Sequence, residues 1–173
     1  MTRTQLEHLI RAVASVADDD ELIIIGSQAV LGQFPSAPAE MLVSVEADLY
    51  PLHRPNRGDL IDGSLGEGSP FHDTYGYYGQ GVDASTAVLP DGWRDRLIAI
   101  RNANTRGATG WCLEVHDLVV SKLVAGREKD LAFARAALKH GLASGDLLRD
   151  RAATLPISED VRRMVLERLE SAG

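Results

Sequence analysis

The chain is poor in cysteine, in aromatic residues and in positive charge, and each shortage argues against a class of protein. Its one cysteine among 173 residues, Cys112, cannot form a disulfide within the chain, and its apolar neighbours favour a buried thiol. Aromatic residues make up only 5%, too few for a platform that stacks nucleic-acid bases. Eighteen Lys and Arg face 25 Asp and Glu, giving a net charge of −7. Unspecific wrapping of nucleic acid needs clustered cations and is therefore disfavoured, although a local basic patch remains compatible with this balance.

Long hydrophobic runs are also missing. No apolar stretch approaches the roughly 18 residues of a membrane-spanning helix, and residues 1–7 lack the apolar core of a signal peptide. We therefore expect a cytoplasmic protein with no membrane partner. The hydrophobic content of 45% suits a folded core, and the length suits one domain or one domain with a helical appendage.

The first two thirds of the chain alternate between helical and strand patterns. Apolar residues at helical spacing predict a helix over 4–17, and a short helix is expected from Ser27. The predicted strands, from β-branched runs bounded by breakers, are 22–25, 41–49, 75–82 and a hairpin of 96–100 with 110–113.

Beyond residue 114 the pattern becomes purely helical. The predicted helices are 115–124, 130–138, 146–153 and 160–169. The sequence therefore predicts an α/β fold in which a small mixed sheet flanked by helices, residues 1–114, is followed by a helical region, residues 115–173, packed on that core.

Two acidic residues on the second predicted strand are the most informative feature. Glu46 and Asp48 are two positions apart, so an extended strand would place both carboxylates on one face. Their mutual repulsion is relieved by water or by a cation, and Mg²⁺ commonly binds one or two carboxylates together with substrate phosphates. The alternative is an exposed strand with two solvated acids.

A glycine and a serine follow the first predicted strand. Gly26 allows close approach of a ligand to the backbone, and Ser27 can donate a hydroxyl hydrogen bond, so this turn is suited to phosphate. A lone Gly-Ser pair is weak evidence. Together with a downstream acid-x-acid strand it forms a more specific combination.

These residues resemble the nucleotidyltransferase superfamily with the DNA-polymerase-β-like core. Its signature is an apolar strand, Gly-Gly or Gly-Ser, a helix and then acid-apolar-acid, matched here by Ile25-Gly26-Ser27 and Glu46-Ala47-Asp48. More narrowly, the chain is similar to the minimal nucleotidyltransferases that act as toxins of toxin–antitoxin and abortive-infection systems. Residues 117–130 resemble their second signature, a lysine-bearing helix followed by an Arg-x-Lys-Asp turn. The departures are a Glu as first acid, Gln28 after the serine and a longer, proline-containing gap before Glu46.

The resemblance implies a fold, a cofactor and partners. It implies Mg²⁺ or Mn²⁺ held by Glu46, Asp48 and a third carboxylate on a neighbouring strand. Asp83 is the best candidate for that third ligand and Asp73 the reserve, although Asp83 could simply open a loop. The implied substrates are an NTP and an acceptor hydroxyl on RNA, such as a tRNA 3′ end, or on a protein. The implied partner is a cognate antitoxin.

Lys122 and the charged turn that follows its helix complete the candidate site. Lys122 lies in an otherwise apolar helix, where a cation either extends to solvent or meets an anion. By resemblance, that anion is a nucleotide phosphate. Asp130 could cap the next helix. By resemblance, Lys129 and Asp130 instead border the active site, where Asp130 orients Lys122 or a metal-bound water, and Arg127 contacts the triphosphate.

The resulting functional hypothesis is metal-dependent transfer of a nucleoside monophosphate from an NTP to a hydroxyl. Two alternatives remain at this point. One is a non-catalytic module that binds a nucleotide or a protein on the same fold. The other is an unrelated α/β domain in which Glu46 and Asp48 are exposed, and a structure with these two side chains on opposite faces would establish it.

Overall fold

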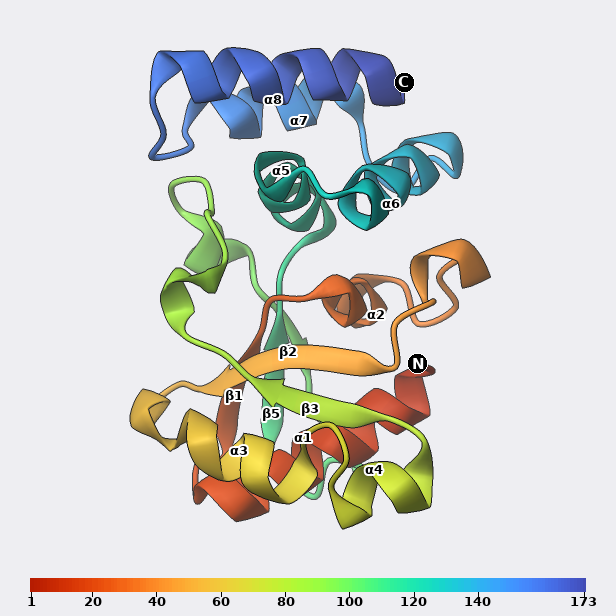
Figure 1. Cartoon of the computed structure of the whole chain (residues 1–173), viewed down its shortest axis with the longest axis vertical. Helices are drawn as coiled ribbons and strands as arrows, with labels where there is room; N and C mark the ends of the chain where they lie inside the picture. Colours follow the sequence, from red (N-terminus) through yellow and green to blue (C-terminus); the bar gives the residue numbers. More distant parts are fainter.

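The computed structural model describes residues 1–173 and contains one mixed five-stranded sheet with helices around it (Figure 1). The strands are β1 (Glu21–Ile24), β2 (Glu46–Pro51), β3 (Tyr78–Gly81), β4 (Ile98–Ile100) and β5 (Thr109–Cys112), in the order β3-β2-β1-β5-β4. β1 is antiparallel to β2 and parallel to β5. β2 is parallel to β3, and β4 is antiparallel to β5. The α/β fold class and the hairpin predicted from the sequence are confirmed.

One side of the sheet is covered by α1 (Arg3–Ala17), α3 (Gly58–Leu65) and α4 (Pro70–Tyr75), which lie below β2 and β3 in Figure 1. The apolar face of α1 is buried, and Thr2 begins the helix with a capping box to Gln5. Glycines on the strands allow this close packing. A Cβ on Gly79 would meet the Leu9 side chain at 3.3 Å, and one on Gly110 would meet the Ile10 side chain at 2.5 Å.

The four C-terminal helices gather at the other end of the molecule, above the sheet in Figure 1. They are α5 (Val115–Ala125), α6 (Glu128–Lys139), α7 (Gly145–Ala153) and α8 (Glu159–Ala172), and their prediction is confirmed. Buried Asp117 on α5 pairs with Arg96, before β4, and with Arg151 on α7, at N–O distances of 2.8 and 3.2 Å. This network ties the helices to the sheet. The division into 1–114 and 115–173 as separate domains stays a prediction.

Short elements connect these parts. They are α2 (Val30–Gln33) and the 3₁₀ helices η1 (Ser27–Ala29), η2 (Ala39–Met41), η3 (Pro55–Arg57), η4 (Ala84–Thr86) and η5 (Trp93–Arg96). Cys112 is fully buried, as predicted. No helix combines the length and the apolar character that crossing a bilayer requires.

The predicted strand over 41–49 is wrong in its first half. Met41 ends η2, residues 42–45 have no regular structure, and β2 begins only at Glu46 and continues through Pro51. The β-branched residues of the early segment do not serve a sheet, because Val43 and Val45 have 79% and 46% of their surface exposed. The Ser44 hydroxyl instead accepts the backbone N–H of Glu46 and fixes the entry to the strand.

Candidate functional site

Glu46 and Asp48 occupy the face of β2 that α1 does not cover. Between and after them, Ala47 and Leu49 are fully buried, so the strand alternates as a half-buried strand should. Both carboxylates line one cavity between β2 and the C-terminal helices. The alternative in which the two acids point to opposite faces is therefore wrong.

Asp48 lies in direct contact with the turn after β1. A Cβ on Gly26 would come within 2.2 Å of Asp48 Oδ2, so only glycine fits at this position without displacing the carboxylate. The Ile25 N–H also donates to the Asp48 carbonyl at 3.0 Å. Burial and the neighbouring Glu46 raise the pKa of Asp48, against the opposing effect of Lys122, Lys129 and Arg127. The charged form of Asp48 is therefore disfavoured by its surroundings, and a cation bound beside it would stabilise that form.

The predicted third metal ligand lies elsewhere. Asp83 is exposed and caps η4 by accepting the Ser85 N–H at 2.8 Å, a contact that lowers the pKa of Asp83. It follows the end of β3, which runs parallel to β2 and pairs Gly81 with Leu49, so Asp83 lies beyond the stretch of β3 that faces the acids. The reserve candidate, Asp73, is exposed on α4, on the other side of the sheet. Neither prediction agrees with the structure.

The positions beside the two acids on β3 belong to other residue types. Tyr78 is in register with Glu46 and Gln80 with Asp48. The Tyr78 hydroxyl donates to Glu46 Oε2 at 2.8 Å. No group of three His, Cys, Asp or Glu side chains is placed to hold a metal. Two carboxylates nevertheless fit a hard divalent cation that takes its remaining ligands from phosphate and water, whereas a cage of three carboxylates does not fit this chain.

Lys122 faces this strand from α5 and is held by a buried carboxylate on α6. Its Nζ donates to Asp130 Oδ1 at 3.0 Å, and Arg127 Nε donates to Asp130 Oδ2 at 2.6 Å. The turn between the helices depends on Gly126, whose φ of 67° lies in the left-handed region. Lys122 Nζ also lies 4.8 Å from the centre of the Phe133 ring.

The capping interpretation of Asp130 is wrong. α6 begins at Glu128 with Arg127 at the cap position, and Asp130 lies inside the first turn with 0% of its side chain exposed. Burial acts to raise the pKa of Asp130, but the hydrogen bonds from Arg127 and Lys122 hold it below its ordinary value. Burial also lowers the pKa of Lys122, and Asp130 opposes that shift. The pair is therefore an ion pair whose charges stabilise each other.

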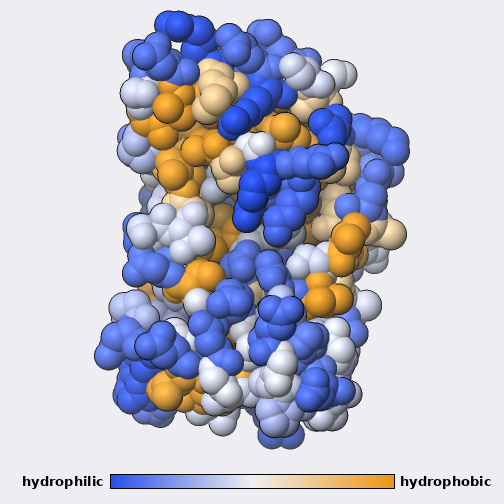
Figure 2. Space-filling view, viewed as in Figure 1, coloured by the Kyte–Doolittle hydropathy of each residue, from blue (hydrophilic) through white to orange (hydrophobic).

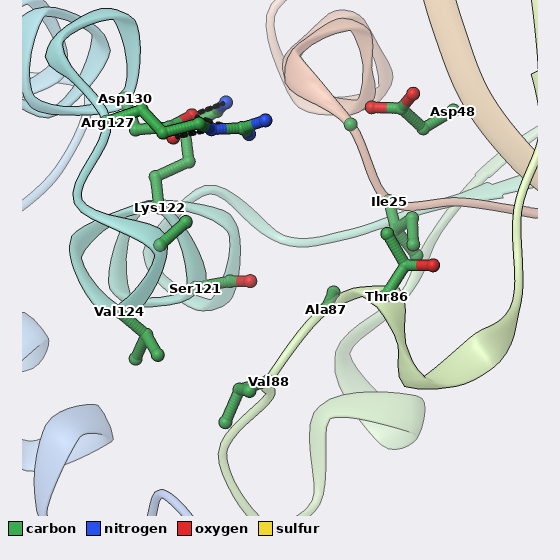
Figure 3. A pocket seen from close by; sticks show the side chains of 12 residues that line it. Ile25, Asp48, Thr86, Ala87, Val88, Ser121, Lys122, Val124, Arg127 and Asp130 are labelled. Atoms are coloured by element: carbon green, nitrogen blue, oxygen red, sulfur yellow. Dashed lines mark hydrogen bonds and ion pairs between the residues drawn. The ribbon is translucent and has the colours of Figure 1, made fainter. Parts of the chain in front are cut away.

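Two adjoining cavities join these groups. The face of the molecule in Figure 2 has hydrophilic side chains gathered at its centre, between the sheet and the C-terminal helices. In the first cavity, Asp48 and Ile25 lie across from Lys122, Arg127 and Asp130 (Figure 3). The second cavity shares Asp48, Lys122 and Arg127 with the first. Together the two cavities are lined by eight of the predicted site residues: Gly26, Ser27, Glu46, Asp48, Lys122, Arg127, Lys129 and Asp130.

Residues 4–167 match the model of a family described as nucleotidyltransferase of unknown function, DUF6036. The chain belongs to this family. No curated protein and no solved structure matches it. The nucleotidyltransferase resemblance seen in the sequence is thereby confirmed at the level of the family, while its toxin–antitoxin part stays a prediction.

Three residues of this DUF6036 site were missed from the sequence. Tyr78 contacts Glu46, and Thr86 and Ser121 line the cavities. Tyr78 could have been found, because its strand is predicted and a parallel neighbour of β2 would present alternate residues beside the acids. Ser121 adjoins Lys122 in a predicted helix. Thr86 gave no signal, since it lies in a short polar loop.

Proposed function

We propose that this DUF6036 protein transfers a nucleoside monophosphate from an NTP to an acceptor hydroxyl, with Mg²⁺ or Mn²⁺ as cofactor. The observation that carries the proposal is the arrangement of charge across the cavity. Two carboxylates on β2 face a lysine and an arginine from α5 and the start of α6. A metal-bound triphosphate needs both kinds of group, because carboxylates bind the cation and basic side chains bind the phosphate oxygens.

Each residue has a role that follows from its position. Glu46 and Asp48 would hold the cation, which supplies neutralisation of the charge that develops on the transferred phosphate. Gly26 and Ser27 lie beside Asp48 and would bind phosphate oxygens through the backbone and the hydroxyl. The acceptor hydroxyl attacks the α-phosphorus and releases its proton to water, the bond from that phosphorus to the oxygen that bridges the α- and β-phosphates breaks, and pyrophosphate leaves.

The basic residues differ in exposure and therefore in role. Lys122 is fixed by Asp130 and would place a constant positive charge beside the leaving pyrophosphate. Arg127 has 64% of its side chain exposed, and Lys129 is exposed at the mouth of the second cavity. These two residues would contact the outer phosphates and attract the anionic substrate in spite of the net negative charge of the chain.

The acceptor and the partners are the finer part of the proposal. We propose RNA, with a tRNA 3′ end as the first candidate, or a protein hydroxyl as acceptor, and a cognate antitoxin as regulator. The resemblance of the 117–130 segment to the toxin signature supports this assignment. Comparing growth on expression of wild-type protein and of Asp48→Asn tests the toxin role.

Label transfer tests the activity itself. Wild-type protein is incubated with each of the four NTPs labelled at the α-phosphate, with Mg²⁺ and with total tRNA or cell protein. Label is expected on one acceptor with wild type and with Asp73→Asn, a matched acid on the far side of the sheet, and none with Asp48→Asn or with chelator. Wild-type protein that binds NTP but labels nothing would contradict the enzymatic function.

One observation favours a second candidate, the non-catalytic binding module. The residues of β3 in register with Glu46 and Asp48 are Tyr78 and Gln80, so the neighbouring strand brings no third carboxylate beside the two acids. Calorimetric titration of NTP with and without Mg²⁺ separates the two functions. Affinity that is independent of Mg²⁺, together with no transfer, supports the module.

A further inference from the structure

The second cavity has an apolar wall to which the proposed function gives no role. Its wall is formed by Met41 at the end of η2 and by Val43 and Val45 in the segment that leads into β2, with Phe133 of α6 also lining the cavity. The same cavity contains Glu46 and Asp48. Apolar and metal-binding side chains therefore adjoin within one continuous space.

Val43 and Val45 are exceptional in this chain. Only four large hydrophobic residues are exposed, and these two, at 79% and 46%, lie within three residues of Glu46. Exposed apolar side chains that cluster beside polar groups indicate a binding surface rather than a packing requirement. Figure 2 shows hydrophobic atoms at the right of the central polar region, over the segment that precedes β2.

The segment that carries the wall is anchored to the core. Fully buried Gln28 donates from Nε2 to the Ser44 carbonyl at 2.9 Å, and the Ser44 hydroxyl accepts the Glu46 N–H at 3.1 Å. At its start, Glu40 of η2 pairs with Lys139 of α6 at 3.2 Å. Because both ends are fixed, the valines are presented to the cavity without the entropic cost of ordering a free loop.

We infer that Val43 and Val45 form the subsite for the nucleobase of the NTP. This inference rests on the proposed function, which places the triphosphate between Asp48 and the Lys122 and Arg127 side chains. A nucleotide bound there has one large apolar part, its base, and the valines are the exposed apolar surface of the same cavity. Contact with aliphatic side chains recognises any base by its flat face, so the four NTPs should bind with similar affinity.

Binding measurements on three ligands separate the wall from the phosphate site. Affinities of ATP, of UTP and of inorganic tripolyphosphate are measured by calorimetry with Mg²⁺ for wild type, for the double variant Val43→Ser with Val45→Ser, and for Leu60→Ser. Leu60 is a matched control, because it is 50% exposed on α3, on the other side of the sheet. The double variant should bind both NTPs about tenfold more weakly and tripolyphosphate unchanged, while Leu60→Ser should change neither.

The outcomes distinguish this inference from the proposed function. If tripolyphosphate binds to wild type as tightly as the NTPs do, or if the double variant retains full NTP affinity, the base subsite is wrong and the phosphate site stands. If NTP affinity is retained but label transfer falls, the wall contacts the acceptor instead, and the inference is likewise overturned. If neither NTP nor tripolyphosphate binds to wild type, the proposed function and the subsite both fail.

Discussion

The Tyr78 hydroxyl donates a 2.8 Å hydrogen bond to Oε2 of Glu46 across the parallel pair of β3 and β2. Burial and this contact raise the pKa of Tyr78 to about 12, so the hydroxyl remains a donor throughout the physiological range. A carboxylate held in this way has one oxygen engaged by the protein. The tyrosine therefore orients a proposed metal ligand from the strand that was expected to supply a third acid.

Removing the Tyr78 hydroxyl tests this orienting role. Tyr78→Phe should weaken the apparent affinity for Mg²⁺ about tenfold, seen as a higher Mg²⁺ concentration for half-maximal NTP binding, because partners of metal ligands fix ligand geometry. It should also lower the free energy of unfolding by about 1 kcal/mol in urea. Tyr75→Phe is the matched control, since Tyr75 is exposed. An unchanged Mg²⁺ requirement in Tyr78→Phe would remove the tyrosine from the site.

The local sequence pattern was sufficient to predict most of the helices and strands and the shared face of the two acids in the site. The helical spacing of Leu6, Leu9 and Ile10 predicts α1, and period two alone places Glu46 and Asp48 on one face. These features depend on neighbours within a few residues. They do not depend on how distant segments of the chain pair with one another.

Features that depend on pairing between distant segments could not be predicted in the same way. The direction and register of β3 decide whether Asp83 or Tyr78 lies beside Glu46, and the local sequence predicts neither the direction nor the register. The role of Asp130 could not be predicted locally either, because an aspartate serves equally as a helix cap and as a buried ion-pair partner. The Lys122 side chain, eight residues earlier, decides between them. In the segment 41–45, β-branched residues favour a strand, whereas exposure to the cavity explains Val43 and Val45 better.

The contact between Gly26 and Asp48 gives a second prediction. Gly26→Ala places a Cβ where Asp48 Oδ2 now lies, so the carboxylate must move. We expect at least about a hundredfold loss of transfer activity with about 1–3 kcal/mol of destabilisation. Gly63→Ala is the control, because a Cβ there meets nothing within 4 Å and alanine favours the helix. Label transfer and urea unfolding of both variants measure the difference; full activity in Gly26→Ala would show that Asp48 tolerates displacement.

Asp48 itself should cost the protein stability in the absence of a cation. Its pKa is raised by burial and by Glu46, so the charged form is disfavoured in the folded state. Asp48→Asn should therefore raise the free energy of unfolding by about 1 kcal/mol at pH 7 while abolishing transfer. Glu40→Gln is a comparison in which an acid paired with Lys139 is removed, and no gain is expected there. A stability loss in Asp48→Asn would contradict the strain that we assign to this carboxylate.

The difference in free energy of unfolding between Asp48→Asn and wild type should grow as pH rises. Between the ordinary value of 3.8 and the raised pKa, folded Asp48 keeps a proton that the unfolded chain has released. Wild-type stability therefore falls as pH rises through this window, and the variant has no such slope. The difference should be absent below pH 3.8 and complete above the folded pKa. Urea titrations from pH 3.5 to 7 with chelator present measure it.

The buried pair of Lys122 and Asp130 gives the last prediction. Asp130→Asn leaves the Lys122 ammonium buried without its carboxylate, and we expect a loss of about 3 kcal/mol in the free energy of unfolding at pH 7. Lys122→Met in the same chain should recover part of that loss, since the uncompensated charge is gone.

Burial already lowers the pKa of Lys122, and without Asp130 this pKa falls further. Between the lowered pKa of Lys122 in the folded chain and its ordinary value of 10.5, the unfolded chain binds a proton that the folded chain has released. The stability of Asp130→Asn should therefore rise with pH more steeply than that of wild type. Equal slopes for the two proteins between pH 7 and 10 would mean that Asp130 does not hold the charge on Lys122.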